Sequence, residues 1–336
     1  MKTLSIKDIA ALANVSITTV SFIINGKAKE KSISDAVIKK VEKVIADSGY
    51  TPNQTARSLR TGNSYTIGLL VEDISNTFFA KVARMIEDKA YAKGYKIIYS
   101  STENNAERAK ELIHLFKSRN LDAYIISPIS GIESEIQMLL NDNKPVIFFD
   151  RNLSAIKTSY VGVDHFQACY DAVEAFIKAG KNKIALITTD IKVDQIIERH
   201  TGYKAAIADG GLPYDENLVL KIPFNQTELQ TISSIENLFL SREIDAVLFA
   251  TNYLTLSGLR ALKNIRRTVN EGFTVMGYDD HVAFELHTPE ISTVQQPIEE
   301  ISESIINLIL KELSSKIKSE KEQVIFPATL ILRSPH

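Results

Sequence analysis

Acidic, amide and hydroxyl side chains and one arginine recur directly after the strands that the sequence predicts in residues 64–336. They are Glu72, Asp73, Asn76, Ser127, Asp150, Arg151, Thr189, Asp190, Asn252, Asp279 and Asp280. In open sheets of parallel strands, ligands bind beyond the carboxyl ends of the strands, where such side chains meet. Together with the nearby aromatic residues Phe78, Phe79, Tyr95 and Phe224, they suit a polyhydroxylated ring, with a purine or nucleoside as the alternative.

Each of these residues also has a purely structural interpretation. Asp73 and Asp150 are placed to cap a helix or turn, and Phe78 and Phe79 are apolar enough for the core. Arg199 needs an acidic partner if it binds no ligand, and either Glu198 or Asp190 could supply one. We favour ligand contact for Asp73 and Asp150, and above all for Arg199.

The sequence lacks the patterns of several other sites. It has six histidines without metal-ligand spacing, no P-loop, no G-x-S-x-G and no dinucleotide fingerprint, so we expect no metal, no cofactor and no enzyme activity. Its single cysteine, Cys169, excludes an internal disulfide and is expected to be inert packing. No signal-peptide core or membrane-length apolar run is present, so we expect a cytoplasmic chain without a membrane partner.

The elements that would position these residues alternate between strand and helix. This order predicts an α/β body of parallel sheets covered by helices, in two similar lobes around a crevice. We place lobe one at about 64–163 and 296–323, and lobe two at about 164–295 and 324–336. Residues 292–297 would cross back to lobe one, where the helix at 298–313 would pack.

A basic segment precedes this body. Residues 1–62 carry ten Lys plus Arg against five Asp plus Glu, which gives +5, whereas the remainder carries 29 against 36, which gives −7. Residues 1–49 predict three short helices, with Ser5, Ser16 and Ser34 as N-caps and a tight turn at Asn14. Ile17, Thr18, Ser21 and Phe22 would face outward, as in a helix that enters a major groove.

A joint at 50–63 separates head and body. Pro52 prevents a helix from continuing, Asn53 can cap a new one, and Gly62 can end it. A helix this short is marginal in water unless something holds it. Its arginines and the exposed Leu59 suggest that DNA does so.

In order and spacing, several motifs resemble those of the LacI/GalR family of bacterial transcription regulators, and the resemblance extends over the whole chain. They are Ile6-Lys7-Asp8-Ile9-Ala10, Val15-Ser16-Ile17-Thr18-Thr19-Val20-Ser21, Asn25-Gly26, Gly49-Tyr50-Thr51-Pro52-Asn53, Ala56-Arg57-Ser58-Leu59-Arg60, Asp73-Ile74-Ser75-Asn76-Thr77-Phe78-Phe79, Arg199-His200-Thr201-Gly202-Tyr203, Gly277-Tyr278-Asp279-Asp280 and Gln295-Gln296-Pro297.

The resemblance implies a helix-turn-helix domain, a hinge helix and a periplasmic-binding-protein-like body that forms a homodimer on a palindromic operator. Leu59 would insert into the minor groove beside Ala56 and kink the duplex. Phe22 departs from the family, where arginine is common, and cannot make that residue's bidentate contact with guanine. The DNA-binding residues implied are Ser5, Ser16, Ile17, Thr18, Thr19, Ser21, Phe22, Asn25, Lys29, Tyr50, Asn53, Ala56, Arg57 and Leu59.

The resemblance also implies an effector site between the lobes. Thr77 stands where the family often has proline, and Tyr253 replaces the acid of an Asn-Asp pair. The effector-binding residues implied are Asp73, Asn76, Phe78, Phe79, Asp150, Arg199, Phe224, Asn252, Asp279 and Gln296.

We therefore expect a sequence-specific regulator, a repressor, whose operator affinity is controlled by a small molecule, a sugar or sugar derivative. The alternative is a cytoplasmic sugar-binding receptor without a role on DNA, which the basic head disfavours. An enzyme is a third, weaker interpretation that rests only on the acids of the crevice. The end of the sequence has no leucine heptads, so we expect a dimer without a tetramerising tail.

Overall fold

The computed structural model describes residues 4–50, 63–315 and 320–333. The chain forms two compact units, Met1–Ser64 and Tyr65–His336. Most of the predicted hinge at 50–63 lies outside the described residues, including Asn53, Ala56, Arg57 and Leu59. The predictions for these four residues therefore stay predictions.

The first unit contains three helices, α1 (Ile6–Leu12), α2 (Ile17–Ile24) and α3 (Asp35–Ser48). Ser5 and Asp8 form a reciprocal capping box at the start of α1, and the Ser16 hydroxyl accepts from the Thr19 amide at 3.0 Å. Asn14 has a φ of 48°, as the tight turn between α1 and α2 requires. The predicted helix-turn-helix order is therefore confirmed.

One detail of the head differs from the prediction. Ser34 occupies the N-cap position of α3, but its side chain makes no capping hydrogen bond. On α2 the most buried residues are Val20 and Ile23, with Ile24 only half-buried. Ile9, Val20 and Val41, one from each helix, lie fully buried at the centre of the small core.

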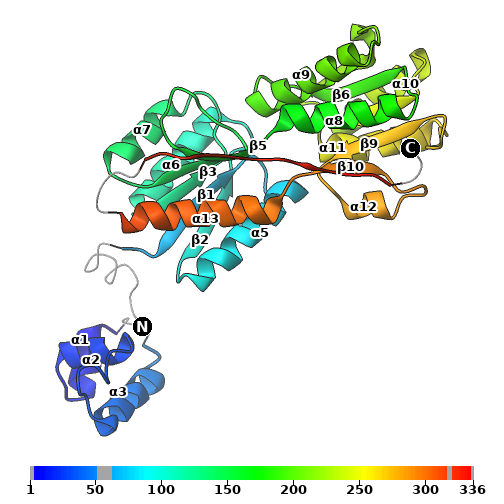
Figure 1. Ribbon diagram of the computed structural model, residues 1–336. Coiled ribbons are helices and arrows are strands. Elements are labelled where there is room, and N and C mark those ends of the chain that lie inside the picture. Colours follow the sequence, from blue (N-terminus) through cyan, green and yellow to red (C-terminus); the bar gives the residue numbers. More distant parts are fainter. Residues whose placement is uncertain (1–3, 51–62, 316–319, 334–336) are drawn as a thin grey trace. The chain divides into compact units, whose positions relative to one another are not determined.

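Sheet A, in lobe one, is a six-stranded sheet with the order β11-β5-β4-β3-β1-β2, and all its pairings are parallel. Helices α5 (Thr77–Ala92) and α13 (Ile298–Ser314) share an apolar core on one face. Helices α6 (Ala106–Ser118) and α7 (Glu133–Asn141) pack on the other face (Figure 1). The strands are β1 (Thr66–Val71), β2 (Lys96–Ser101), β3 (Ala123–Ile126), β4 (Val146–Phe149), β5 (Ser159–Val163) and β11 (Gln323–Phe326).

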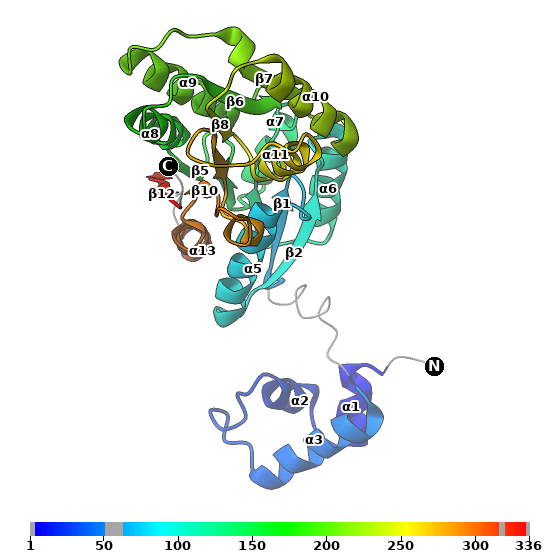
Figure 2. The same cartoon turned by 90° about the vertical axis from the view of Figure 1, so that its right-hand side faces the viewer.

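Sheet B, in lobe two, has the order β12-β10-β9-β8-β6-β7 and is parallel except for the β10–β12 pair. Helices α8 (His165–Lys178) and α9 (Asp194–Asp209) cover one face, and α10 (Glu228–Ser241) and α11 (Asn252–Asn264) the other (Figure 2). Two short helices, η1 (Glu216–Leu218) and α12 (Val282–Glu285), lie in connections. The strands are β6 (Ile184–Asp190), β7 (Val219–Pro223), β8 (Ala246–Phe249), β9 (Thr274–Tyr278), β10 (Ser292–Gln295) and β12 (Thr329–Ile331).

The chain passes between the two sheets at three places: between β5 and α8, between β10 and α13, and between β11 and β12. The last crossing corrects the predicted lobe boundary, because 324–336 does not belong wholly to lobe two. Strand β11 pairs with β5 in sheet A, where Val324 and Phe326 pack on the core, and only β12 joins sheet B.

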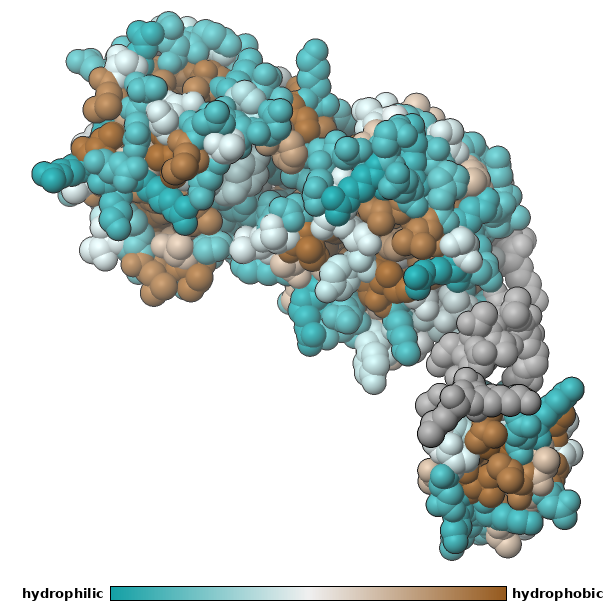
Figure 3. Space-filling view, turned by 180° about the vertical axis from the view of Figure 1, so that it is seen from behind, coloured by the Kyte–Doolittle hydropathy of each residue, from teal (hydrophilic) through white to brown (hydrophobic). Residues whose placement is uncertain are grey.

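The outer surface of both lobes is mixed. On the face seen in Figure 3, hydrophobic residues form separate patches divided by hydrophilic side chains. No single helix of the described residues is long and apolar enough to span a membrane, and only the bent α1–α2 pair passes that test, by length and composition alone.

Candidate functional site

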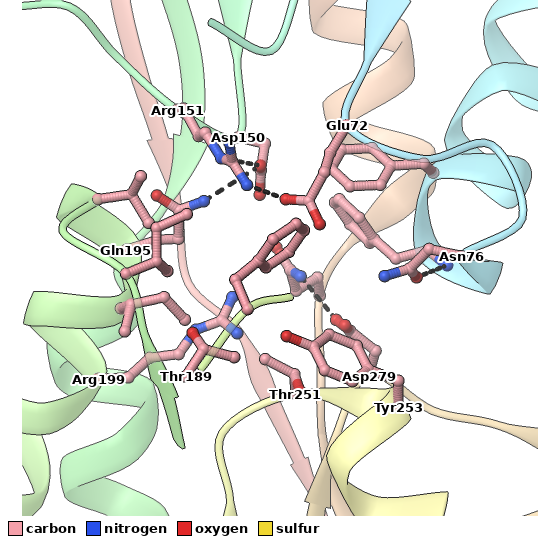
Figure 4. A pocket seen from close by; sticks show the side chains of 17 residues that line it. Glu72, Asn76, Asp150, Arg151, Thr189, Gln195, Arg199, Thr251, Tyr253 and Asp279 are labelled. Atoms are coloured by element: carbon pink, nitrogen blue, oxygen red, sulfur yellow. Dashed lines mark hydrogen bonds and ion pairs between the residues drawn. The ribbon is translucent and has the colours of Figure 1, made fainter. Parts of the chain in front are cut away.

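A cavity lies at the carboxyl ends of the strands of both sheets (Figure 4). Its volume is about 50 Å³, which leaves room for one or two water molecules rather than a sugar ring. A larger ligand therefore requires the lining side chains or the lobes to move apart. The lining residues are Glu72, Asn76, Phe78, Phe79, Asp150, Arg151, Thr189, Ile191, Val193, Gln195, Ile196, Arg199, Phe224, Thr251, Tyr253, Asp279 and Gln296.

Arg199 is held rigidly in the wall of this cavity. Its residue is 4% exposed, Nη1 donates to the Ala250 carbonyl at 2.5 Å, and the guanidinium carbon lies 3.7 Å from the centre of the Tyr278 ring. Within the described residues, neither Glu198 nor Asp190 forms an ion pair with Arg199, and the aspartates that act on its charge are Asp279 and Asp150. A guanidinium has five donors, so Arg199 keeps donors for a ligand.

His165 connects Arg199 to Tyr278 on the lobe-two side. Its Nδ1 lies 2.6 Å from the Tyr278 hydroxyl and 3.4 Å from Arg199 Nη2. Burial and the Arg199 cation hold the pKa of His165 well below its usual range, so the ring is neutral. Arginine can only donate, so the neutral tautomer with its proton on Nε2 is the one that lets Nδ1 accept from Arg199 as well as from the Tyr278 hydroxyl.

Two aspartates occupy equivalent positions in the two lobes. Asp150 follows β4 and Asp279 follows β9, and both have left-handed backbone conformations, with φ of 61° and 62°. Such a conformation is uncommon for a residue with a side chain and is concentrated at functional sites. Gln195 Nε2 lies 3.3 Å from Asp150 Oδ2, and Gln296 Nε2 donates to Asp279 Oδ1 at 2.6 Å.

The two carboxyl groups are costly to bury. Burial raises the pKa of Asp150 to about 7, although Arg199 and the Ser127 hydroxyl lower it, and Asp279 adds a further increase. Burial also raises the pKa of Asp279, against the opposing effects of Arg199 and Gln296. The cavity therefore holds a carboxyl group that changes charge near neutral pH.

We expect Asp150→Asn to stabilise the protein increasingly as the pH rises from 5 to 8. The pKa of Asp150 is raised on folding, so its stabilising contribution is present at low pH and is lost as the pH rises towards 7. Asparagine avoids that loss, and the gain at pH 8 should be on the order of 2–4 kcal/mol. Denaturant unfolding at several pH values measures it, with the exposed Asp142→Asn as the control. A gain independent of pH would contradict the assignment.

Two contacts at the edge of the cavity join the lobes directly. Asn252 Nδ2, at the start of α11, donates to Asn76 Oδ1 at 2.8 Å and lies 3.2 Å from Thr77 Oγ1. Lys81 of α5 donates to the Asp280 carbonyl at 3.1 Å. The lobes are thus held together by the protein's own side chains.

The head presents a partly exposed surface on α2. Ile17 is 42% exposed and Thr18 is exposed, whereas Phe22 is half-buried with Lys31 Nζ 5.5 Å from the centre of its ring. The lysine of the basic loop thus brings a positive charge beside Phe22.

Other residues expected to bind DNA are engaged within the head. Asn25 donates to the Ser21 carbonyl at 2.6 Å, and Ser5 and Ser16 cap helices. The Tyr50 ring packs against the core, and burial raises the pKa of its phenol. Ser21 is half-buried and Lys29 is exposed, so of these residues Lys29 is the most accessible to a phosphate.

Comparison with known proteins agrees with both parts of the chain. Residues 5–53 match the family described as bacterial regulatory proteins, lacI family, and residues 173–334 match the periplasmic binding protein-like domain. The HTH-type transcriptional regulator RegA of Clostridium saccharobutylicum is 30% identical over 330 residues, which cover 96% of each chain. The chain belongs to the lacI family. It is therefore a transcription regulator and not an enzyme.

Other relatives match this chain over nearly its whole length. The sucrose operon repressor of Lactococcus lactis is 31% identical, over 92% of this chain and 93% of the repressor. Among solved structures, the lac repressor dimer bound to operator superposes with a TM-score of 0.84 at 20% identity, covering 99% of this chain and 98% of that one. A CelR–cellobiose complex has a TM-score of 0.72 at 24% identity, covering 98% and 99%. At these identities the solved structures show the fold.

Most residues that the family resemblance pointed to line the cavity: Asn76, Phe78, Phe79, Asp150, Arg199, Phe224, Asp279 and Gln296. Two others do not. The Asp73 carboxylate accepts from the Ser75 amide at 2.8 Å and the Ser75 hydroxyl at 2.6 Å, so it closes a turn. Asn252 joins the lobes instead, and Thr77, where the family often has proline, supplies a hydroxyl to that contact.

The effector-binding residues implied by the resemblance do not include several residues that line the cavity. Glu72, Arg151 and Thr189 are among the strand-end side chains that the sequence singles out, but the resemblance assigns them no role. Gln195 lies four residues before Arg199 on α9, so helical spacing could have indicated it. Tyr253, which replaces an acid of the family pattern, also lines the cavity. Loop residues such as Ile191 and Val193 carry no such signal.

Proposed function

We propose that this protein is a transcriptional repressor whose affinity for operator DNA is controlled by a sugar bound between its two lobes. The proposal depends chiefly on one observation: Arg199, Asp150 and Asp279, from different elements of both lobes, line one cavity. Fixed donors and acceptors of this kind suit the hydroxyl groups of a sugar. The names of relatives, which include sucrose and ribose operon repressors, support it.

The effector would regulate operator affinity by shifting an equilibrium between arrangements of the lobes. A sugar that binds one arrangement of the lobes better than another shifts the protein towards that arrangement, and the coupling to DNA is usually about 1–3 kcal/mol. The Asn252 and Lys81 contacts stabilise the present arrangement without a ligand. We infer that the sugar changes the arrangement of the lobes, either by replacing these contacts or by forming further contacts beside them.

We further propose that the regulator acts in the cytoplasm as a homodimer on a palindromic operator. A single helix-turn-helix head contacts little DNA, and a two-fold protein matches a two-fold site. Ile17, Thr18 and Phe22 would read bases, Lys29 would contact phosphate, and Leu59 would open the minor groove. The alternative receptor without a DNA role leaves the head unexplained.

Selection of bound DNA from a random pool tests this function. The purified full-length protein should enrich one two-fold symmetric sequence, and a panel of sugars should contain at least one that changes its affinity several-fold. Nucleosides and purine bases belong in the panel as competitors for the same cavity. Failure to enrich any sequence, or an enriched sequence whose binding responds only to a purine, would count against the proposal.

A further inference from the structure

The cavity wall contains a buried ion pair that the proposed role of Arg199 does not explain. Glu72 directly follows β1, and Arg151 lies just after β4. Both side chains point into the cavity from lobe one (Figure 4). Arg151 Nη2 donates to Glu72 Oε2, and Nη1 donates to Asn104 Oδ1. The side chains are only 6% and 12% exposed, so solvent screens this pair little.

Arg151 is thereby committed to the protein. Its Nε lies 3.8 Å from Asp150 Oδ2, so carboxylates face the guanidinium on two sides. Burial lowers the pKa of Arg151 to about 10, which still leaves it charged at neutral pH. An anionic ligand that paired with Arg151 would take it away from Glu72 and leave that carboxylate buried without its partner, which is costly.

The charges of the whole cavity lining also disfavour an anionic ligand. Three carboxyl groups, on Glu72, Asp150 and Asp279, face two guanidinium groups, on Arg151 and Arg199. Because burial raises the pKa of Asp150 to about 7, the lining carries no strong excess of positive charge at neutral pH, so it offers a dianionic phosphate ester little net attraction.

Among the described residues, some buried polar atoms of the cavity lining have no hydrogen-bond partner, and they include both donors and an acceptor. Within the described part of the chain, the Nε–H groups of Arg151 and Arg199 donate to nothing, and Gln195 Oε1 accepts from nothing. Gln195 is 6% exposed, and its amide nitrogen already faces Asp150. Hydroxyl groups donate and accept at one atom, so a polyol suits a lining that offers both unused donors and an unused acceptor.

We infer that the cavity selects an uncharged sugar, and that the Glu72–Arg151 pair is the element that excludes phosphorylated sugars. The inference rests on the proposed function, because it names the chemical class of the same effector. Glu72 acts through Arg151 by holding the guanidinium away from an anionic group, and its second oxygen remains an acceptor for a hydroxyl.

Matched pairs of sugars test the inference on the full-length protein. Glucose, fructose, ribose and sucrose are compared with glucose 6-phosphate, fructose 1-phosphate, ribose 5-phosphate and sucrose 6-phosphate by thermal shift and calorimetry. In the best-binding pair, the neutral sugar should bind the wild type roughly tenfold or more tightly than its phosphate, because Glu72 holds Arg151 and leaves it unable to pair with the ester. Glu72→Gln should reduce or reverse that ratio, since Arg151 is then released.

Glu107→Gln is the control, because Glu107 is exposed, pairs with Lys110 and does not line the cavity. It should leave the ratio unchanged. Circular dichroism establishes that the Glu72→Gln variant is folded, and the ratio of affinities is insensitive to a general loss of binding.

The outcomes separate the two proposals. A wild type that prefers a phosphate, or a ratio that Glu72→Gln does not move, would overturn the inference while leaving a sugar-controlled repressor intact. A panel without any response would count against the inference and the sugar effector together. Enrichment of an operator in the selection experiment would still support the DNA-binding role in that case.

Discussion

Replacing Arg199 with alanine is expected to abolish the response of operator binding to the effector, while operator binding itself persists. Arg199 is buried in the cavity wall, and its orientation is set by the Ala250 carbonyl and the Tyr278 ring. A hydrogen bond to a charged group contributes about 1.5–3 kcal/mol. Loss of one or more such bonds should weaken effector binding roughly 10- to 100-fold or more.

Two variants show whether the loss is specific. Arg199→Lys keeps the charge but not the planar donors, so it should restore only part of the response. Arg108→Ala removes an arginine that is paired with Glu103 outside the cavity, and it should respond like the wild type. The measurement is a titration of operator affinity with the effector. A normal response of Arg199→Ala would show that the ligand binds elsewhere.

The helices, strands and lobes could be predicted because their residues alternate between apolar runs and amphipathic stretches. β4 and the part of β1 after Thr66 are apolar, as strands covered on both faces must be. Strand β11 is different. Its residues alternate between exposed and half-buried at a sheet edge, so its pattern did not indicate which sheet it joins. Only its register beside β5 decides that.

The site could be predicted in part because strand ends converge. Asp150 and Asp279 follow directly from that rule, and both line the cavity. Asp73 follows the same rule but closes a turn with Ser75, since a carboxylate next to a serine can bond locally. The Glu72–Arg151 pair could not be anticipated, because the pairing depends on β1 and β4 lying on either side of β3 in sheet A.

Close packing of α8 against α9 explains the glycine that follows Arg199. An added Cβ on Gly202 would lie 2.2 Å from the Phe166 carbonyl oxygen and 3.1 Å from the Tyr170 amide nitrogen. Both atoms belong to the backbone of α8, so they cannot rotate away as a side chain could. The two helices carry Arg199 and His165, whose contact lies next to this point. Gly202 therefore sets the separation at which those side chains meet.

We expect Gly202→Ala to destabilise the protein and to weaken the effector response. Forcing α9 away from α8 should cost about 1–3 kcal/mol, as overpacking of a core usually does. It should also move Arg199 relative to His165 and the cavity, because the residue lies less than one turn from the clash. Gly210→Ala, at the end of α9, is the control, since its Cβ would meet chiefly the end of the Ile177 side chain, 2.6 Å away, which can rotate, and would lie 3.1 Å from the Ala206 carbonyl oxygen. Denaturant unfolding and effector titration of both variants measure the effects. Equal behaviour of the two would show that the spacing of α8 and α9 does not control the position of Arg199.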